Sequence, residues 1–214
     1  MRRALFLTLP SLLLFQLPAS AEWNDLLDGK DLTGWEVVGD GVWTVMHDGI
    51  LLGQRDPRLP KSPNDPDQSW LYTKAEYGEF DLHVEWWTRL NGNSGVSIRD
   101  VSRARYAHGA EADPKRTPAH LGYEIQISNG YRDRYPTGSV YTFVAAQTGF
   151  QNDNDWNAMD IESRKDTIRV KLNGHAVAEY PGDPQRGKTG PIGLQLHDRT
   201  SIAMFRNIRI REVK

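Results

Sequence analysis

The side chains best suited to chemistry in this sequence are polar residues that alternate with apolar ones. Glu124 and Gln126 do so over positions 123–127, and Gln195 and His197 over positions 194–197. Arg99 ends a third such segment, 96–99. Strict alternation predicts β-strands with one apolar and one polar face. If the three strands share a sheet, the five polar side chains lie on one surface, where they could bind hydroxyl groups or move protons.

Such a surface suits a carbohydrate. Amides and carboxylates pair with sugar hydroxyls, and aromatic rings stack on the apolar face of a sugar ring. Aromatic residues of β-sandwiches are more often in the core or at its rim, and a single histidine is more often structural than catalytic. Composition therefore assigns no stacking residue. The aromatic candidates are Trp70, Tyr72, Trp86, Trp87, Tyr106, Tyr123, Tyr141 and Trp156.

The rest of the chain also reads as short strands separated by turns. Asp48-Gly49 and Asn173-Gly174 are typical of hairpin turns, and no window has a sustained helical period. The pattern predicts an all-β fold, a two-sheet β-sandwich or jelly roll. The other expected strands are 35–38, 42–46, 50–52, 70–73, 80–86, 139–143, 168–172, 176–180 and 208–211.

Two segments are long for loops of a compact domain. Residues 55–69 carry four prolines, and residues 100–121 are dense in ionisable side chains. Loops of this length are often functional. For the first, a site wall and a surface insertion are equally good interpretations. The second follows the segment that ends in Arg99, so we expect it to form one wall of the site.

The first 21 residues have the layout of a secretory signal peptide. Arg2 and Arg3 precede an apolar run over 4–17, and the small-residue pattern Ala19-Ser20-Ala21 follows. The run is too short to span a bilayer comfortably. We therefore expect cleavage after Ala21, a single β-sandwich domain over 22–214, and export to the periplasm or the extracellular space.

Charge and composition exclude several classes of function. The formal net charge of −2 becomes −4 when Arg2 and Arg3 are removed, so no basic excess favours a nucleic-acid partner. No later segment has the length and apolarity of a membrane span. The absence of cysteine excludes thiol catalysis and thiolate metal sites. No phosphate-binding glycine loop, nucleophile elbow or metalloprotease helix is found.

One short stretch is rich in oxygen ligands. Residues 152–155, Asn-Asp-Asn-Asp, could hold Ca²⁺, which prefers carboxylate and amide oxygens. The stretch lacks the spacing of an EF-hand loop, so a polar turn is the preferred interpretation.

An ordered set of short segments resembles the bacterial 3-keto-disaccharide hydrolase domain family. The resemblance covers nearly the whole of residues 22–214 and implies a concanavalin-like jelly roll with a sugar-facing concave sheet. It also implies activity on glycosides whose glucose C3 hydroxyl has been oxidised to a ketone. The segments are 23–35, 71–73, 77–82, 92–96 with Arg99, 123–127, 138–141, 156–157, 172–174, 190–195 with His197, and 205–210.

The implied chemistry is elimination followed by hydration. A ketone at C3 acidifies the C2 hydrogen, a base removes it, the enolate expels the aglycone from C1, and water adds back. Glu124 and His197 are the candidates for the acid and the base, and the sequence does not decide which of the two is the base. Arg99 could stabilise the enolate or bind hydroxyl groups. Gln126, Gln195 and Tyr141 are expected to bind the substrate.

Three alternatives stay open at this point. A divalent cation such as Ca²⁺ could stabilise the enolate, with Glu124 and His197 as its ligands. The domain could be a non-catalytic carbohydrate-binding module of the same fold, or a structural domain whose polar face only contacts water.

Overall fold

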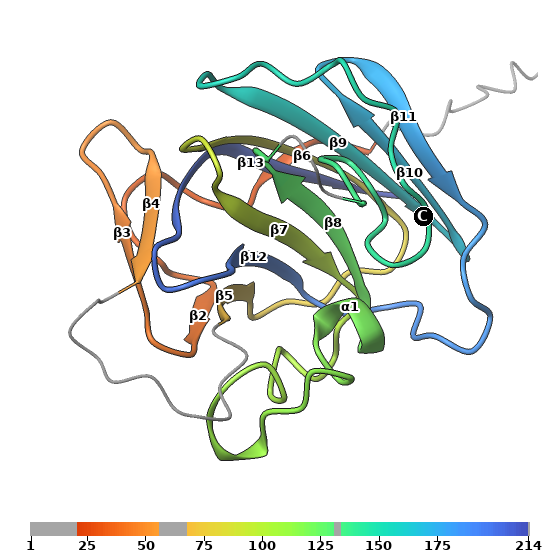
Figure 1. Cartoon of the computed structure of the whole chain (residues 1–214), viewed down its shortest axis with the longest axis horizontal. Coiled ribbons are helices and arrows are strands. Elements are labelled where there is room, and N and C mark those ends of the chain that lie inside the picture. Colours follow the sequence, from red (N-terminus) through yellow and green to blue (C-terminus); the bar gives the residue numbers. More distant parts are fainter. Residues whose placement is uncertain (1–20, 56–67, 131–133, 214) are drawn as a thin grey trace, which may run out of the picture.

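The computed structural model describes residues 21–55, 68–130 and 134–213, which form two antiparallel β-sheets packed face to face (Figure 1). The predicted all-β sandwich is therefore confirmed. The expected signal peptide lies almost wholly outside the described residues, and so does most of the proline-rich segment 55–69. No helix of the described part is long and apolar enough to cross a membrane.

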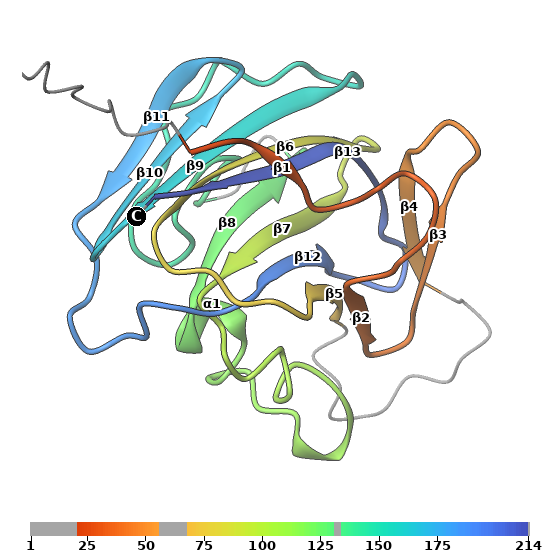
Figure 2. The ribbon, with the colours of Figure 1, turned by 180° about the vertical axis from the view of Figure 1, so that it is seen from behind.

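The larger sheet has eight strands in the order β11-β10-β9-β6-β13-β4-β3, and β1 pairs with β13 (Figure 2). Its long central strands carry strict alternation, so every second side chain faces the other sheet. Its strands are β1 (Asn24–Asp25), β3 (Gly41–Val45), β4 (Leu51–Arg55), β6 (Phe80–Thr88), β9 (Asn157–Arg164), β10 (Thr167–Leu172), β11 (His175–Tyr180) and β13 (Ile202–Glu212).

The smaller sheet has five strands in the order β2-β5-β12-β7-β8. Three of the expected site segments are adjacent in it, because β7 pairs with both β12 and β8. Its strands are β2 (Trp35–Val38), β5 (Ser69–Thr73), β7 (Asn93–Ile98), β8 (Tyr123–Ser128) and β12 (Ile192–Leu196).

The core lies between the sheets and takes the apolar residues of both. On β8 these are Tyr123, Ile125 and Ile127, all fully buried. Glu124 and Gln126 consequently face away from the core, as the alternation predicts. We call this opposite side of the five-stranded sheet the outer face.

Most expected strands and turns are confirmed. Asn173 and Gly174 both have positive φ in the turn between β10 and β11, as their types predict. Segment 139–143 does not form a strand: it makes isolated bridges, and Thr142 turns the chain at φ 69°. Strand β9 was not predicted.

Residues 100–121 leave from the end of β7 and return at the start of β8. They contain only a short 3₁₀ turn, η1 (Gly109–Glu111), and a single helical turn, α1 (Pro118–Leu121). The segment projects below β5, β12 and β7 in Figure 1. It therefore lies on the side of the small sheet that carries Glu124.

Candidate functional site

Strand register aligns one row of residues across the outer face. Tyr72 on β5 pairs with Gly193 on β12, Gly193 with Ser97 on β7, and Ser97 with Glu124 on β8. Beyond β8, the Tyr141 amide donates to the Glu124 carbonyl oxygen at 2.8 Å. Because Val140 bridges Ile125 on the core side, Tyr141 lies beside Glu124 on the outer face.

A second row lies one residue pair further along the strands. Trp70 pairs with Gln195, and Gly95 pairs with Gln126. Gln195 follows Leu194, which pairs with Val96, so Gln195 lies opposite Gly95. The structure thus brings Glu124, Gln126, Gln195 and Tyr141 together on one face, as the sequence predicted.

The two rows are buried. Glu124 is 4% exposed, and Gln126 and Gln195 are similarly covered. Burial raises the pKa of Glu124 to about 8, and the neighbouring Gln195 amide opposes the rise. At neutral pH the Glu124 carboxyl is therefore mostly protonated, and it ionises near pH 8.

Gln195 carries unused hydrogen-bonding capacity. Among the described residues neither its amide nitrogen nor its amide oxygen has a hydrogen-bond partner of ordinary geometry, although the whole side chain is buried. The Gln195 amide lies close enough to the Glu124 carboxyl to oppose the rise in its pKa. A buried amide with few hydrogen bonds of good geometry is able to bind a polar ligand.

Glycines make room on this face for the larger side chains. A Cβ at Gly95 would lie 2.8 Å from Glu124 Oε1, so the carboxyl lies directly over Gly95. A Cβ at Gly193 would overlap the Tyr72 ring, which lies flat over β12. The two glycines bring the Glu124 carboxyl and the Tyr72 phenol close to the strand backbones.

Tyr72 connects the face to the loop that covers it. Its hydroxyl donates to Asp100 Oδ2 at 2.9 Å, and the Ser97 hydroxyl lies 3.4 Å away. Burial, reinforced by the Asp100 charge, raises the pKa of Tyr72 well above its usual value. Asp100 also accepts from the Ala104 amide and from Ser102, which fixes the start of the loop.

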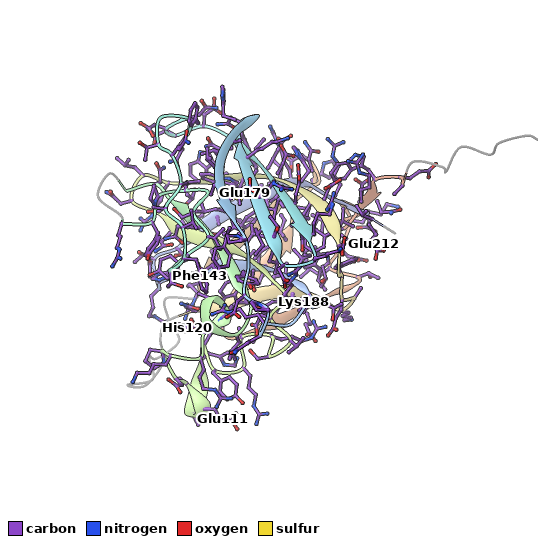
Figure 3. All side chains as sticks on the ribbon, turned by 90° about the vertical axis from the view of Figure 1, so that its right-hand side faces the viewer. Glu111, His120, Phe143, Glu179, Lys188 and Glu212 are labelled. Carbon is purple, nitrogen blue, oxygen red and sulfur yellow. The ribbon has the colours of Figure 1, made fainter. Side chains whose placement is uncertain are left out.

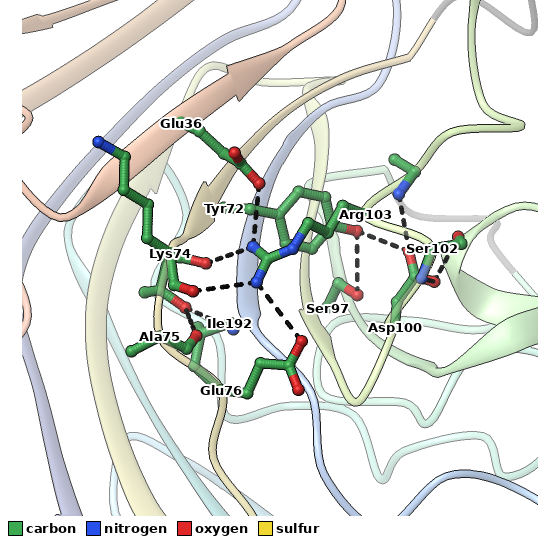
Figure 4. A network of polar contacts seen from close by, with 12 residues as sticks. Glu36, Tyr72, Lys74, Ala75, Glu76, Ser97, Asp100, Ser102, Arg103 and Ile192 are labelled. Atoms are coloured by element: carbon green, nitrogen blue, oxygen red, sulfur yellow. Dashed lines mark hydrogen bonds and ion pairs between the residues drawn. The ribbon is translucent and has the colours of Figure 1, made fainter.

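Arg103 fixes the loop a second time. Figure 4 shows its guanidinium between the loop and the β5 end of the sheet, where it donates to Glu36 at 3.0 Å and to the Thr73 carbonyl at 2.5 Å. It also reaches the Lys74 carbonyl and forms an ion pair with Glu76. The loop is thus held by one residue that faces Tyr72 and by one that spans β2 and β5.

Between these anchors, the loop covers the aromatic part of the face. Ala104 and Ala107 are fully buried and pack on Trp70 and Tyr72, whose rings stack at 5.7 Å. Figure 3 shows Glu111 at the far tip of the loop and His120 nearer the sheet. The loop therefore lies over Trp70 and Tyr72, and the expectation that it forms a wall beside Glu124 stays a prediction. Trp70 and Tyr72, however, are sealed and present no stacking surface.

Arg99 corrects one prediction. By alternation it was expected on the outer face, but it lies beyond β7 in the left-handed region, at φ 61°. This backbone turn directs the guanidinium inward, where Nη2 donates to Ser163 Oγ of the opposite sheet at 2.7 Å. Burial lowers the pKa of Arg99. The side chain links the two sheets and does not join Glu124.

Two glycines explain how Arg99 adopts this turn. A Cβ at Gly190 would lie 2.6 Å from the Arg99 Cα, and a Cβ at Gly122 would lie 2.5 Å from the Ile98 carbonyl oxygen. Both neighbouring backbones must therefore approach closely. The reversal also turns the next residue, Asp100, toward Tyr72.

His197 follows β12 two residues after Gln195, and it is partly exposed. Along a strand two residues span ~7 Å, so His197 belongs to the next row beyond Gln195. The backbone of Glu124 lies two rows away from His197. The row between these two residues contains Gln195 and the carboxyl group of Glu124. A joint role in proton transfer stays a prediction, and it fits a ligand that spans both rows.

No group of three or more histidine, aspartate or glutamate side chains in the described ranges is arranged to hold a metal ion. In the Asn-Asp-Asn-Asp stretch, the Asn152 amide donates to Asn157 and Asp155 accepts from the Trp156 amide. These contacts are those of a polar turn. The possible Ca²⁺ remains a question for experiment.

A comparison with protein-family models identifies the family of this chain. Residues 22–211 match the model of the 3-keto-alpha-glucoside-1,2-lyase-like domain. The chain belongs to this family. The resemblance drawn from its short segments is therefore confirmed, and no curated protein matches the chain.

Solved structures share the family's fold. A proposed glycosyl hydrolase from Parabacteroides distasonis is 26% identical, with a TM-score of 0.67, and the match covers 90% of this chain and 100% of that one. A second from the same organism is 21% identical, with a TM-score of 0.66 and coverages of 90% and 94%. The carbohydrate-binding module CBM66 from Bacillus subtilis is 16% identical, with a TM-score of 0.52 and coverages of 84% and 96%.

Sequence reasoning missed the roles of Tyr72 and Asp100. Tyr72 was one of many aromatic candidates, and Asp100 was only the first residue of a charged loop. A signal was present, because Tyr72 occupies an outer-face position of a predicted strand, and Asp100 directly follows the segment that ends in Arg99. The contact between Tyr72 and Asp100 could not be predicted without knowing the strand register.

Proposed function

We propose that this domain cleaves glycosides whose C3 hydroxyl has been oxidised to a ketone, with Glu124 as the proton-transferring group. The family and the fold neighbours support a carbohydrate-related function. The observation that carries the finer proposal is the buried Glu124 carboxyl, whose pKa is raised to about 8 and whose neighbour is the buried side-chain amide of Gln195.

A pKa near 8 suits the removal of a C2 proton. The ionised carboxyl is a stronger base than an ordinary glutamate, and at pH 7 about one molecule in ten is ionised. General bases work best when their pKa lies near the working pH. An ordinary glutamate, with a pKa of about 4.3, would be a much weaker base.

The reaction proceeds in two balanced steps. In the first, Glu124 takes the C2 proton, the electron pair forms the C1–C2 double bond, and the C1–O bond breaks as the aglycone oxygen takes up a proton. In the second, water adds its oxygen to C1 and a proton returns to C2. The net change is one water consumed and one alcohol released for each glycosidic bond.

Gln195 and His197 supply the remaining roles in this proposal. In this scheme the Gln195 amide, which lies beside the Glu124 carboxyl, would donate an N–H to the enolate oxygen that develops at C3. His197, one row further along the strands, would protonate the departing oxygen. Arg99, expected to stabilise the enolate, is engaged with Ser163 and takes no part in this scheme.

A non-catalytic carbohydrate-binding module is the second candidate. It is favoured by the side-chain amides of Gln195 and Gln126, which would suit sugar hydroxyls without any reaction, and by the fold similarity to CBM66. Binding alone needs a hydrogen-bonding side chain at position 124, and an amide would serve. Catalysis needs a group that ionises.

The deciding experiment compares a 3-keto-disaccharide with its unoxidised parent, with and without a chelator. We expect the protein to cleave only the oxidised sugar, because only its C2 hydrogen is acidic. Binding of either sugar without cleavage would identify a binding module. Loss of activity in the chelator, restored by Ca²⁺, would show that a cation participates and would change the role given to Gln195.

Export is proposed separately, on the layout of residues 1–21. N-terminal sequencing of the protein isolated from its native cells should begin at Glu22. A retained Met1 in the final location would contradict it.

A further inference from the structure

Two large aromatic rings are buried on the outer face of the five-stranded sheet, away from the main core. Trp70 and Tyr72 are both 0% exposed, their ring centroids are 5.7 Å apart, and their planes differ by 21°. Together with Ala104 and Ala107 they form a small cluster that is separate from the core between the sheets. The loop after β7 therefore shields these rings from water, and the core does not.

The side chains that cover the rings are small. The loop contributes Ala104 and Ala107 to the cluster, and both are fully buried. Their contact with the rings buries only two methyl groups and the ring area beneath them. Opening the loop would therefore remove far less apolar contact than separating the two sheets would.

Residues 101–116, which we call the strap, are held together by contacts of their own. The Arg116 guanidinium lies 3.5 Å from the centre of the Tyr106 ring. Near the tip of the strap, where Figure 3 shows Glu111, Arg105 Nη2 donates to Glu111 Oε1 at 2.9 Å. These contacts remain intact if the strap moves as one body, as a compact surface loop can.

Arg103 fastens the strap to the sheet. Among the described residues, the hydrogen bonds and ion pairs that join the strap to β2, to β5 and to the segment after β5 all come from this guanidinium (Figure 4). Its carboxylate partners Glu36 and Glu76 are both exposed to water. The amides of the strap that reach Asp100 do so at the residue where the strap begins. One partly exposed side chain therefore holds the strap over the rings.

The backbone at this fastening is strained. Arg103 and Ala104 both lie in the left-handed region, with φ of 50° and 55°. Non-glycine residues adopt this conformation rarely, and two in succession persist only where surrounding contacts hold them. Release of Arg103 from its partners would let this segment relax, so the strain favours opening.

Tyr72 brings the covered surface close to the strand that carries Glu124. Its ring lies over Gly193 of β12, and its hydroxyl lies 3.4 Å from Ser97 Oγ on β7. Ser97 pairs with Glu124 on β8. Aromatic rings stack on the apolar faces of sugar rings. A sugar on the uncovered rings would therefore lie beside the strands that carry Ser97 and Glu124.

We propose that the strap opens when Arg103 leaves the sheet, and that the uncovered rings of Trp70 and Tyr72 bind a sugar ring by stacking. The ligand class rests on the proposed function, whereas the opening rests on the contacts of the strap alone. In the closed state the rings have no free surface. A sugar that stacks on them binds only the open state, so it shifts the population toward that state.

A single introduced thiol measures the opening, because the chain has no cysteine of its own. Ala107→Cys places the thiol under the strap, and Ala203→Cys places a matched thiol at a buried alanine of the main core. A thiol reagent should modify the first protein at least about 100-fold faster than the second, because local opening costs less than separating the sheets. Equal rates would overturn the inference. Ala104→Cys replaces Ala107→Cys if circular dichroism shows that the latter is unfolded.

Two arginine variants test the fastening in the Ala107→Cys protein. Arg103→Ala should raise the modification rate by about 10-fold, because it removes the hydrogen bonds from the strap to the sheet. Arg105→Ala is the matched control, since its partner Glu111 lies within the strap, and it should change the rate by less than about twofold. An unchanged rate in the Arg103→Ala protein would contradict the role given to this residue.

A 3-keto-disaccharide at saturating concentration tests the ligand. It should raise the modification rate of Ala107→Cys by about 3-fold or more and leave that of Ala203→Cys unchanged, because it binds the open state. Protection of the Ala107→Cys thiol, or no change while the sugar is bound or cleaved, would overturn stacking on these rings. If the parent neither binds nor cleaves the sugar, the proposed function fails, and the rates measured without sugar still decide whether the strap opens.

Discussion

Two carboxylates on the outer faces of the two sheets have opposite surroundings. Asp81 on β6 is held by Arg164 and by Arg211, whose Nη2 donates at 2.6 Å. Partial burial acts to raise the pKa of Asp81, but the hydrogen bonds from Arg211 and Arg164 outweigh it and hold this pKa below its usual value. Burial raises the pKa of Glu124 to about 8, and the neighbouring Gln195 side chain is a neutral amide that opposes the rise.

The difference extends to the two faces. On the eight-stranded sheet, acidic and basic side chains form partly solvent-exposed ion pairs. These pairs are Glu85 with Arg206, and Glu162 with Arg169 and Lys171. The five-stranded sheet carries its carboxyl in a buried position without a charged partner among its described pKa determinants. Paired charges on an exposed face contribute modestly to stability, whereas an unpaired buried acid costs stability. This cost points to function at the second face.

The largest expected effect is a difference in catalytic activity between variants of Glu124 and of Asp81. Glu124→Gln should lower kcat on a 3-keto-glycoside by about two to four orders of magnitude, because proton transfer is lost while the side-chain shape is kept. Asp81→Asn, the matched control on the other sheet, should retain parental kcat. Steady-state kinetics of both folded variants measures the contrast, and a Glu124→Gln protein with parental kcat would contradict the assignment.

The pH dependence of stability offers a second separation. In the folded protein the raised pKa keeps Glu124 largely protonated up to about pH 8, whereas in the unfolded chain this carboxyl has its ordinary pKa of 4.5. The raised pKa therefore contributes stability that is complete at low pH and declines as the pH rises from 4.5 to 8. At pH 7 the parent should have lost about 3 kcal/mol of its free energy of unfolding relative to the Glu124→Gln variant, compared with low pH.

Urea unfolding at pH 5 and pH 8 measures this difference. The free energies of unfolding of parent and Glu124→Gln should approach each other at pH 5 and diverge at pH 8, where the variant is the more stable protein. Parallel profiles would mean that Glu124 is solvated and ordinary.

The smallest expected effect concerns Asp81, whose contribution to stability depends on pH in the direction opposite to that of Glu124. The lowered pKa of Asp81 contributes stability that is present above its unfolded value of about 3.8 and is lost as the pH falls through its folded pKa. Asp81→Asn should cost about 1 kcal/mol at pH 7, since the pair is partly exposed, and almost nothing at pH 2. Thermal unfolding at the two pH values checks this, and a loss that persists at pH 2 would assign the effect to packing.

Alternation in the sequence was sufficient to predict the faces. The core positions of β8 and β12 and the outward positions of Glu124, Gln126 and Gln195 follow from a two-residue period alone. The same period is present in Met159-Asp160-Ile161-Glu162, so strand β9 was predictable and was overlooked.

Other features depend on contacts that no local pattern encodes. Arg99 reverses its direction because its backbone enters the left-handed region, where a non-glycine residue is uncommon. The burial of Glu124 could not be foreseen either, because alternation cannot distinguish a polar face in water from one covered by other parts of the chain. Both required the tertiary arrangement.

Gly95, an uncharged residue, affects the pKa of Glu124 through the space that it leaves for the carboxyl group. The Glu124 carboxyl lies over this glycine, in space that a single methyl group would occupy. An alanine there would displace the carboxyl from the strand backbone toward water, and its proton would then be released at a lower pH. The acidity of this enzyme candidate could therefore drift during evolution through a substitution that leaves every ionisable residue in place.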